Sequence, residues 1–86
     1  MNAKWKVLNA FSAISDIDNK PITVLSVYPL VSDYCGDPFN LLLEAEALEF
    51  WQKHIGEIFE VRGDPDLGKL SSEQLRNYLK EKVEFT

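Results

Sequence analysis

The segment Ile22–Tyr28 is the part of this 86-residue sequence whose backbone conformation is least ambiguous. It is dense in β-branched and aromatic side chains, which favour a strand, and Pro29 ends regular pairing because proline has no backbone N–H to donate. The residues before it, Ser15–Pro21, are rich in turn formers. Because a strand needs a partner, we expect an N-terminal β-hairpin whose other arm is Lys4–Ile14.

The arm Lys4–Ile14 has two possible conformations. Its apolar residues fit the spacing of a helix at Val7, Phe11 and Ile14. They also fit the alternation of a strand at Trp5, Val7, Phe11 and Ala13. The strand is favoured because the turn at Ser15–Pro21 and the strand Ile22–Tyr28 that follow would complete a hairpin with it.

A long amphipathic helix is predicted from Asp37 and Pro38 onwards, because aspartate is a good N-cap and proline suits the first helical position. Gly56 is expected to stop it. The predicted apolar face holds Phe39, Leu43, Ala47, Phe50 and His54, and the polar face holds Glu46, Glu49 and Lys53, with Glu49 and Lys53 spaced for an i,i+4 ion pair. Further apolar residues, Leu41, Leu48 and Ile55, widen that face, so a homodimer is possible.

The C-terminal third predicts three shorter elements. Ile58–Val61 is expected to be a short strand, bounded by Gly63 and a loop to Gly68. Ser71 and Gln74 have the spacing of a capping box, which predicts a second, shorter helix. Val83–Thr86 is a possible terminal edge strand. Together these elements predict a single α+β domain over residues 1–86, with a small antiparallel sheet packed by two helices.

Composition limits the function. Hydrophobic residues make up 45% of the chain, which is typical of a folded protein. Fourteen acidic residues against nine basic ones give a formal net charge of -5, which disfavours direct binding of nucleic acid. No apolar run approaches the roughly 20 residues of a membrane span, and no signal peptide is recognisable. With a single cysteine and hence no internal disulfide, a reducing, cytoplasmic setting is expected.

Catalysis receives little support from the sequence. Cys35 would need a base, and the only histidine, His54, is predicted at the far end of the same helix, roughly 25 Å away at ~1.5 Å per residue. Cysteine and histidine are also too few for a structural zinc site. We therefore expect no enzyme activity, no metal and no cofactor.

The remaining function is recognition of another protein. The sequence predicts a small acidic binding module, such as an inhibitor, an antitoxin or immunity-type factor, or an accessory subunit, that binds a basic partner surface. Trp51 is expected to be mostly buried, and Tyr34 to be the most available aromatic side chain. The predicted partner-binding residues are Asp33, Tyr34, Asp37, Glu46, Glu49 and Trp51.

Two other hypotheses remain open. In the first, the chain is a small ligand-binding or hydrolytic domain that uses the loop carboxylates Asp64 and Asp66. In the second, it is a homo-oligomeric structural protein that associates through the wide apolar face of the first helix.

Overall fold

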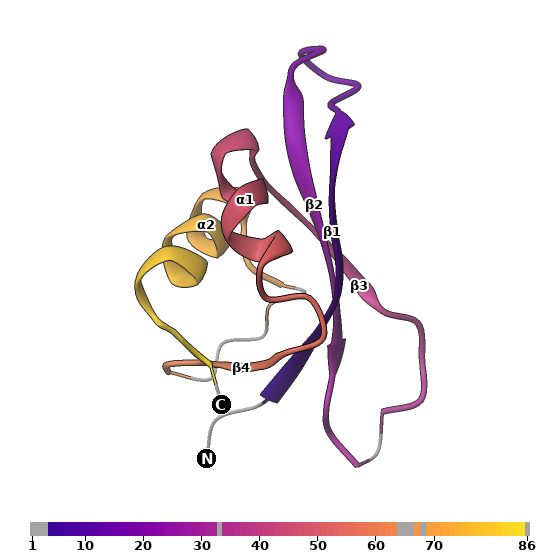
Figure 1. Cartoon of the computed structure of the whole chain (residues 1–86), viewed down its shortest axis with the longest axis vertical. Helices are drawn as coiled ribbons and strands as arrows, with labels where there is room; N and C mark the ends of the chain where they lie inside the picture. Colours follow the sequence, from indigo (N-terminus) through magenta and orange to yellow (C-terminus); the bar gives the residue numbers. More distant parts are fainter. Residues whose placement is uncertain (1–3, 33, 64–66, 68, 86) are drawn as a thin grey trace.

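The computed structural model describes residues 4–32, 34–63, 67 and 69–85. The described residues form five strands in one antiparallel sheet, in the order β3-β2-β1-β4-β5, with two short helices on one side of it (Figure 1). The elements are β1 (Lys4–Ile14), β2 (Pro21–Pro29), β3 (Phe39–Glu44), the 3₁₀ turn η1 (Ala45–Ala47), α1 (Leu48–Gln52), β4 (Ile58–Val61), α2 (Ser72–Glu81) and β5 (Val83–Phe85). The α+β class and the small antiparallel sheet are confirmed.

The N-terminal hairpin is confirmed, and residues 4–14 are a strand. β1 and β2 pair along almost their whole length, with a bulge between Val7 and Asn9. In the connecting turn the N–H of Ser15 donates to the carbonyl of Lys20 at 2.9 Å. Asn19 has a φ of 58°, a left-handed conformation that asparagine tolerates better than most residues.

The predicted long helix after Pro38 is wrong. Residues 39–44 form β3, which pairs with β2, and the chain turns helical only at Ala45. In β3 the buried side chains are Leu41 and Leu43, while Leu42 between them is 48% exposed. This alternation is that of a strand, but a run of three leucines hides it because all three are apolar.

The C-terminal elements agree with the prediction. β4 spans Ile58–Val61, and β5 pairs with it as the edge strand of the sheet. α2 begins with a complete capping box, in which the Ser71 hydroxyl accepts from the N–H of Gln74 and the Gln74 side chain accepts from the N–H of Ser71, both at 3.2 Å. Within the described part of the chain, neither helix has the length and apolar character needed to cross a bilayer.

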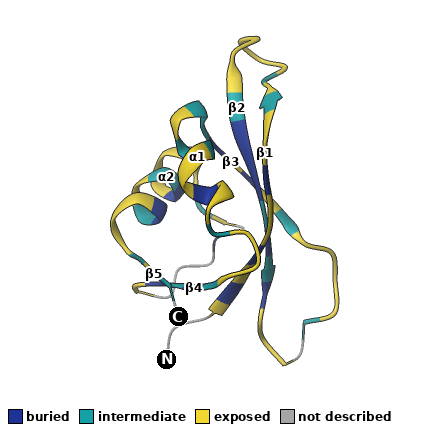
Figure 2. Ribbon diagram, viewed as in Figure 1, coloured by how far each residue is buried: buried dark blue, intermediate teal, exposed yellow. Residues whose placement is uncertain are grey.

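The hydrophobic core lies between the sheet and the two helices. Its largest fully buried side chains include those of Trp51, Phe59 and Leu25, and the hairpin end of β1 and β2 extends beyond the helices and is exposed (Figure 2). On the opposite face Phe11, Val24 and Leu42 form one cross-strand row, which no described element covers. The protein thus has two layers, and function must use the helical layer, the open sheet face or the sheet edges.

Candidate functional site

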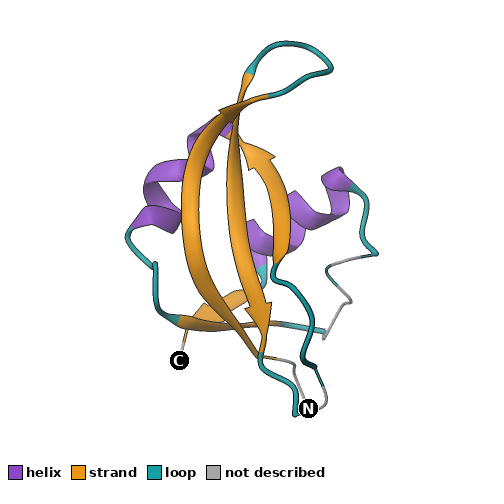
Figure 3. Cartoon of the chain, turned by 90° about the vertical axis from the view of Figure 1, so that its right-hand side faces the viewer, coloured by secondary structure: helices purple, strands orange, loops and turns teal. Residues whose placement is uncertain are grey.

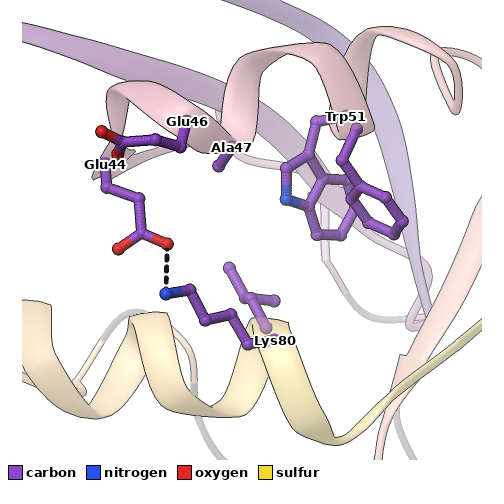
Figure 4. A pocket seen from close by; sticks show the side chains of 7 residues that line it. Glu44, Glu46, Ala47, Trp51 and Lys80 are labelled. Atoms are coloured by element: carbon purple, nitrogen blue, oxygen red, sulfur yellow. Dashed lines mark ion pairs between the residues drawn. The ribbon is translucent and has the colours of Figure 1, made fainter.

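A pocket of about 330 Å³ opens between η1–α1 and α2, at the end of β3 (Figure 4). Two segments far apart in the sequence meet there, residues 44–51 and residues 79–80. They come together because α2 packs beside β3, and η1 and α1 follow directly after β3. Its volume is within the range of small-molecule and side-chain sites. The lining residues are Glu44, Glu46, Ala47, Phe50, Trp51, Leu79 and Lys80.

The charged side of the pocket carries two carboxylates and one ammonium group. Lys80 Nζ and Glu44 Oε1 form an ion pair at 2.7 Å, which ties α2 to the end of β3. Glu46 lines the pocket beside this pair, and among the described residues it has no ion-pair or hydrogen-bond partner. With one carboxylate neutralised and the other free, the pocket has an uncompensated negative charge.

The opposite side of the pocket is aromatic. The indole ring of Trp51 points into it (Figure 4), although the residue is only 2% exposed, so the predicted burial of Trp51 is confirmed. Phe50 stands edge-on to Trp51 with ring centroids 5.2 Å apart and is 46% exposed. Within the described residues the indole N–H has no hydrogen-bond acceptor, which leaves a donor available at the pocket wall. A free carboxylate opposite aromatic faces suits a cation on an apolar stem.

The structure brings together only some of the predicted binding residues. Glu46 and Trp51 share the pocket, whereas Glu49 lies outside its lining and pairs with Lys53 at 3.7 Å, as the i,i+4 spacing predicted. Tyr34 and Asp37 precede β3 and so lie beyond its other end, about 20 Å away for six residues of strand. Asp33, Asp64 and Asp66 lie outside the described residues.

Tyr34 is half-buried rather than freely exposed. Its hydroxyl donates to the carbonyl of Asp37, and its ring packs edge-on against Tyr28 and Phe39. Burial raises the pKa of the Tyr34 hydroxyl above its ordinary value of 10.0, and the nearby Tyr28, Asp37 and Cys35 raise it further. Tyr34 therefore stabilises the β2–β3 loop, with its polar end already hydrogen-bonded within that loop.

The separation of Cys35 and His54 has a different origin from the one predicted, because no helix joins them. Cys35 is exposed in the β2–β3 loop, whereas the His54 ring stacks on Phe85 of β5 at a centroid distance of 3.9 Å. The His54 Nδ1 atom lies 2.8 Å from a Glu57 carboxylate oxygen. From β2 to β5 there are three strand spacings, about 14 Å, so the thiol and the imidazole belong to different parts of the sheet. Among the described residues, no three histidine, cysteine or acidic side chains are grouped to hold a metal ion.

Of the pocket lining, only Glu46 and Trp51 were among the predicted binding residues, while Ala47 and Phe50 were predicted as packing residues of a helix. Glu44, Leu79 and Lys80 join it only through the packing of α2 beside β3, which depends on tertiary geometry. The one available signal was Lys80 directly after Leu79 within the predicted second helix, since a long cationic side chain there can reach the strand beneath.

Comparison with protein-family models, with curated proteins and with solved structures found no match to this chain.

Proposed function

We propose that this chain is a protein-binding module that accepts a basic side chain of its partner in the α1–α2 pocket. The observation that carries the proposal is the Glu46 carboxylate, which has no ion-pair partner in the described ranges and lies opposite the aromatic side chains of Phe50 and Trp51. An arginine fits best, because its planar guanidinium binds a carboxylate while stacking on an aromatic face. Its aliphatic stem would lie along Ala47 and Leu79.

The charge of the whole chain supports a basic partner. A formal net charge of -5 attracts a basic surface over about a Debye length, so association should be faster at low salt. A module of this kind would act by covering a basic surface of another protein, as an inhibitor, an antitoxin or immunity-type factor, or an accessory subunit does. The exposed thiol of Cys35 is compatible with a reducing, cytoplasmic setting.

The test is an NMR titration of the isotope-labelled chain with Nα-acetyl-arginine methylamide. The proposal expects the indole N–H signal of Trp51 to shift while that of Trp5, which does not line the pocket, stays in place. The neutral isostere Nα-acetyl-citrulline methylamide should shift Trp51 far less.

Two variants provide the matched comparison. Glu46→Gln should weaken binding of the arginine probe about threefold, the size typical of one exposed ion pair. Glu49→Gln removes the same charge outside the pocket and should leave binding almost unchanged. Equal weakening by the two variants would reduce the effect to net charge alone, and an unmoved Trp51 signal would contradict the proposal.

A further inference from the structure

A second hollow, of about 400 Å³, runs along the free edge of β3. It follows the strand from Pro38 to Leu42, and its other wall is formed by Leu67, Leu70 and Leu75. In Figure 3, α2 lies behind the sheet on the β3 side. The hollow is therefore bounded by a strand edge on one side and by leucine side chains on the other.

The backbone of β3 has unused hydrogen-bonding groups on that edge. In an antiparallel pair every second residue turns its N–H and C=O away from its partner strand. β3 pairs with β2 on one side, and no described residue makes a backbone hydrogen bond to its other side. These groups are arranged to receive one more strand.

Along β3, the hollow ends at Leu42, and the next residues of the strand, Leu43 and Glu44, belong to the lining near the α1–α2 pocket. A small cavity of about 20 Å³, lined by Leu43 and Arg76 among others, shares Glu44, Trp51 and Lys80 with that pocket. The Nε atom of Arg76 is buried and finds no hydrogen-bond partner among the residues that the structure describes. Because an unsatisfied buried donor is costly, an acceptor brought by a bound molecule would be stabilised there.

We propose that the partner presents its basic side chain from an extended peptide segment that adds to β3 as a sixth strand. This rests on the proposed function and names the form of the partner. An apolar side chain of the segment lies against Leu67, Leu70 and Leu75. A backbone carbonyl of the segment accepts a hydrogen bond from Arg76 Nε. In the segment, the basic side chain follows or precedes the apolar side chain by about four to six residues, because β3 is six residues, about 20 Å, long.

The leucine wall opposite β3 favours one extended peptide segment over a second folded copy of this chain as the occupant of the hollow. A strand needs about 4.8 Å of width beside β3. A second folded copy pairing through its own β3 would have to bring the equivalent of Leu67, Leu70 and Leu75 into the same hollow. A lone extended segment has no such obstacle.

The test begins with selection of random twelve-residue peptides displayed on phage against the full-length chain. Enriched peptides are expected to carry alternating β-forming residues, one apolar anchor and one lysine or arginine. Binding of the synthesised peptide should slow hydrogen exchange of alternate β3 amides. N-methylation of the alternate peptide amides that face β3 should weaken binding about tenfold, because it removes their hydrogen bonds to the strand. N-methylation of the intervening, solvent-facing amides should change binding little.

The outcomes separate the two proposals. Some peptides could depend on Glu46 for affinity without protecting the β3 amides and without showing the alternating methylation effect. Such peptides would overturn strand addition and leave the proposed function standing. Peptides that protect β3 but are indifferent to Glu46→Gln overturn the proposed function. If no peptide is enriched, strand addition is overturned and the edge of β3 is empty. If the β3 amides of the free chain are protected from exchange and this protection disappears on dilution, strand addition by a partner is overturned and a second copy of the chain occupies the edge.

Discussion

Trp51 serves both the core and the pocket. Its ring packs edge-on against Phe59 at a centroid distance of 5.3 Å and contacts Phe85 at 5.7 Å. Its indole nitrogen lies at the pocket wall and has no partner in the part of the chain that the structure describes. Large aromatic side chains that are buried in this way contribute most of the stability of small domains. The core and the candidate pocket therefore share the same residue.

Replacement of Trp51 should separate these two contributions. Trp51→Ala is expected to lower the free energy of unfolding by about 3–5 kcal/mol, because it leaves a cavity among the core rings. Trp51→Phe retains most of the packing, so it should cost clearly less while removing the indole donor. Urea unfolding followed by circular dichroism measures both variants, and Phe50→Ala, at an exposed neighbour, is the control. A cost below about 1 kcal/mol for Trp51→Ala would contradict the assigned core position.

Tyr34 gives a pH prediction with a definite sign. Its pKa is raised in the folded chain, first by burial and then by Tyr28, Asp37 and Cys35, so folding favours the protonated hydroxyl. Its contribution to stability should be complete below pH 10 and should decline as the pH rises through the higher folded-state pKa. Absorbance titration of tyrosinate, with Tyr34→Phe as reference, measures this. A Tyr34 that titrates at or below the free value would contradict the packing described for its ring.

Among the elements, those whose determinants are local were predictable from the sequence. The hairpin follows from the β-branched residues of β2 and the turn before it, and α2 follows from its Ser71–Gln74 capping box. β3 was not predictable, because Asp37 and Pro38 resemble a helix start and leucine has a high helix propensity. Pairing with β2 overrides that propensity by burying Leu41 and Leu43 against the helical layer.

The candidate site was only partly predictable for the same reason. Glu46 and Trp51 could be selected as an acid and a large aromatic side chain close together in the sequence. Their opposite wall comes from α2, about 30 residues later, and only the packing of α2 on the sheet places it there. A site built across elements requires the tertiary arrangement before its full lining can be identified.

The start of α2 gives a test of local helix signals. Ser71→Ala removes the side-chain acceptor for the N–H of Gln74 and should cost about 1 kcal/mol of stability. Ser32→Ala, at an exposed loop position, is the matched control and should cost almost nothing. Thermal unfolding compares the two variants. If their midpoints are equal, the capping box does not contribute to the stability of this chain.

The ion pair between Lys80 of α2 and Glu44 of β3 gives a prediction of tighter binding, in contrast to the weaker binding expected for Glu46→Gln. Lys80→Met releases the Glu44 carboxylate, so the arginine probe should bind about threefold tighter. Lys53→Met releases Glu49 in the same way but outside the pocket, and it should have little effect. NMR titration measures both affinities. Weaker binding to the Lys80 variant would show that the pocket does not select for positive charge.

At the scale of the whole molecule, the protein combines a net negative charge with a two-layer fold in which, among the described residues, no strand pairs with the outer edge of β3 and no helix covers the second sheet face. In the proposed function, long-range attraction would bring a basic partner close, and the pocket would then select one of its side chains. The reason for expecting a homodimer through a wide helix face no longer applies, because Leu41 and Leu43 belong to β3 and are buried in the core.

The most direct measurement is a double-mutant cycle between Glu46 and the charge of the probe. NMR titration of the wild-type chain and of Glu46→Gln with the arginine and citrulline probes yields four dissociation constants. A specific pairing in the α1–α2 pocket predicts a coupling of about 0.5–1 kcal/mol, which should decrease as salt is added. A coupling of zero, with both probes responding equally to the loss of Glu46, would contradict the account.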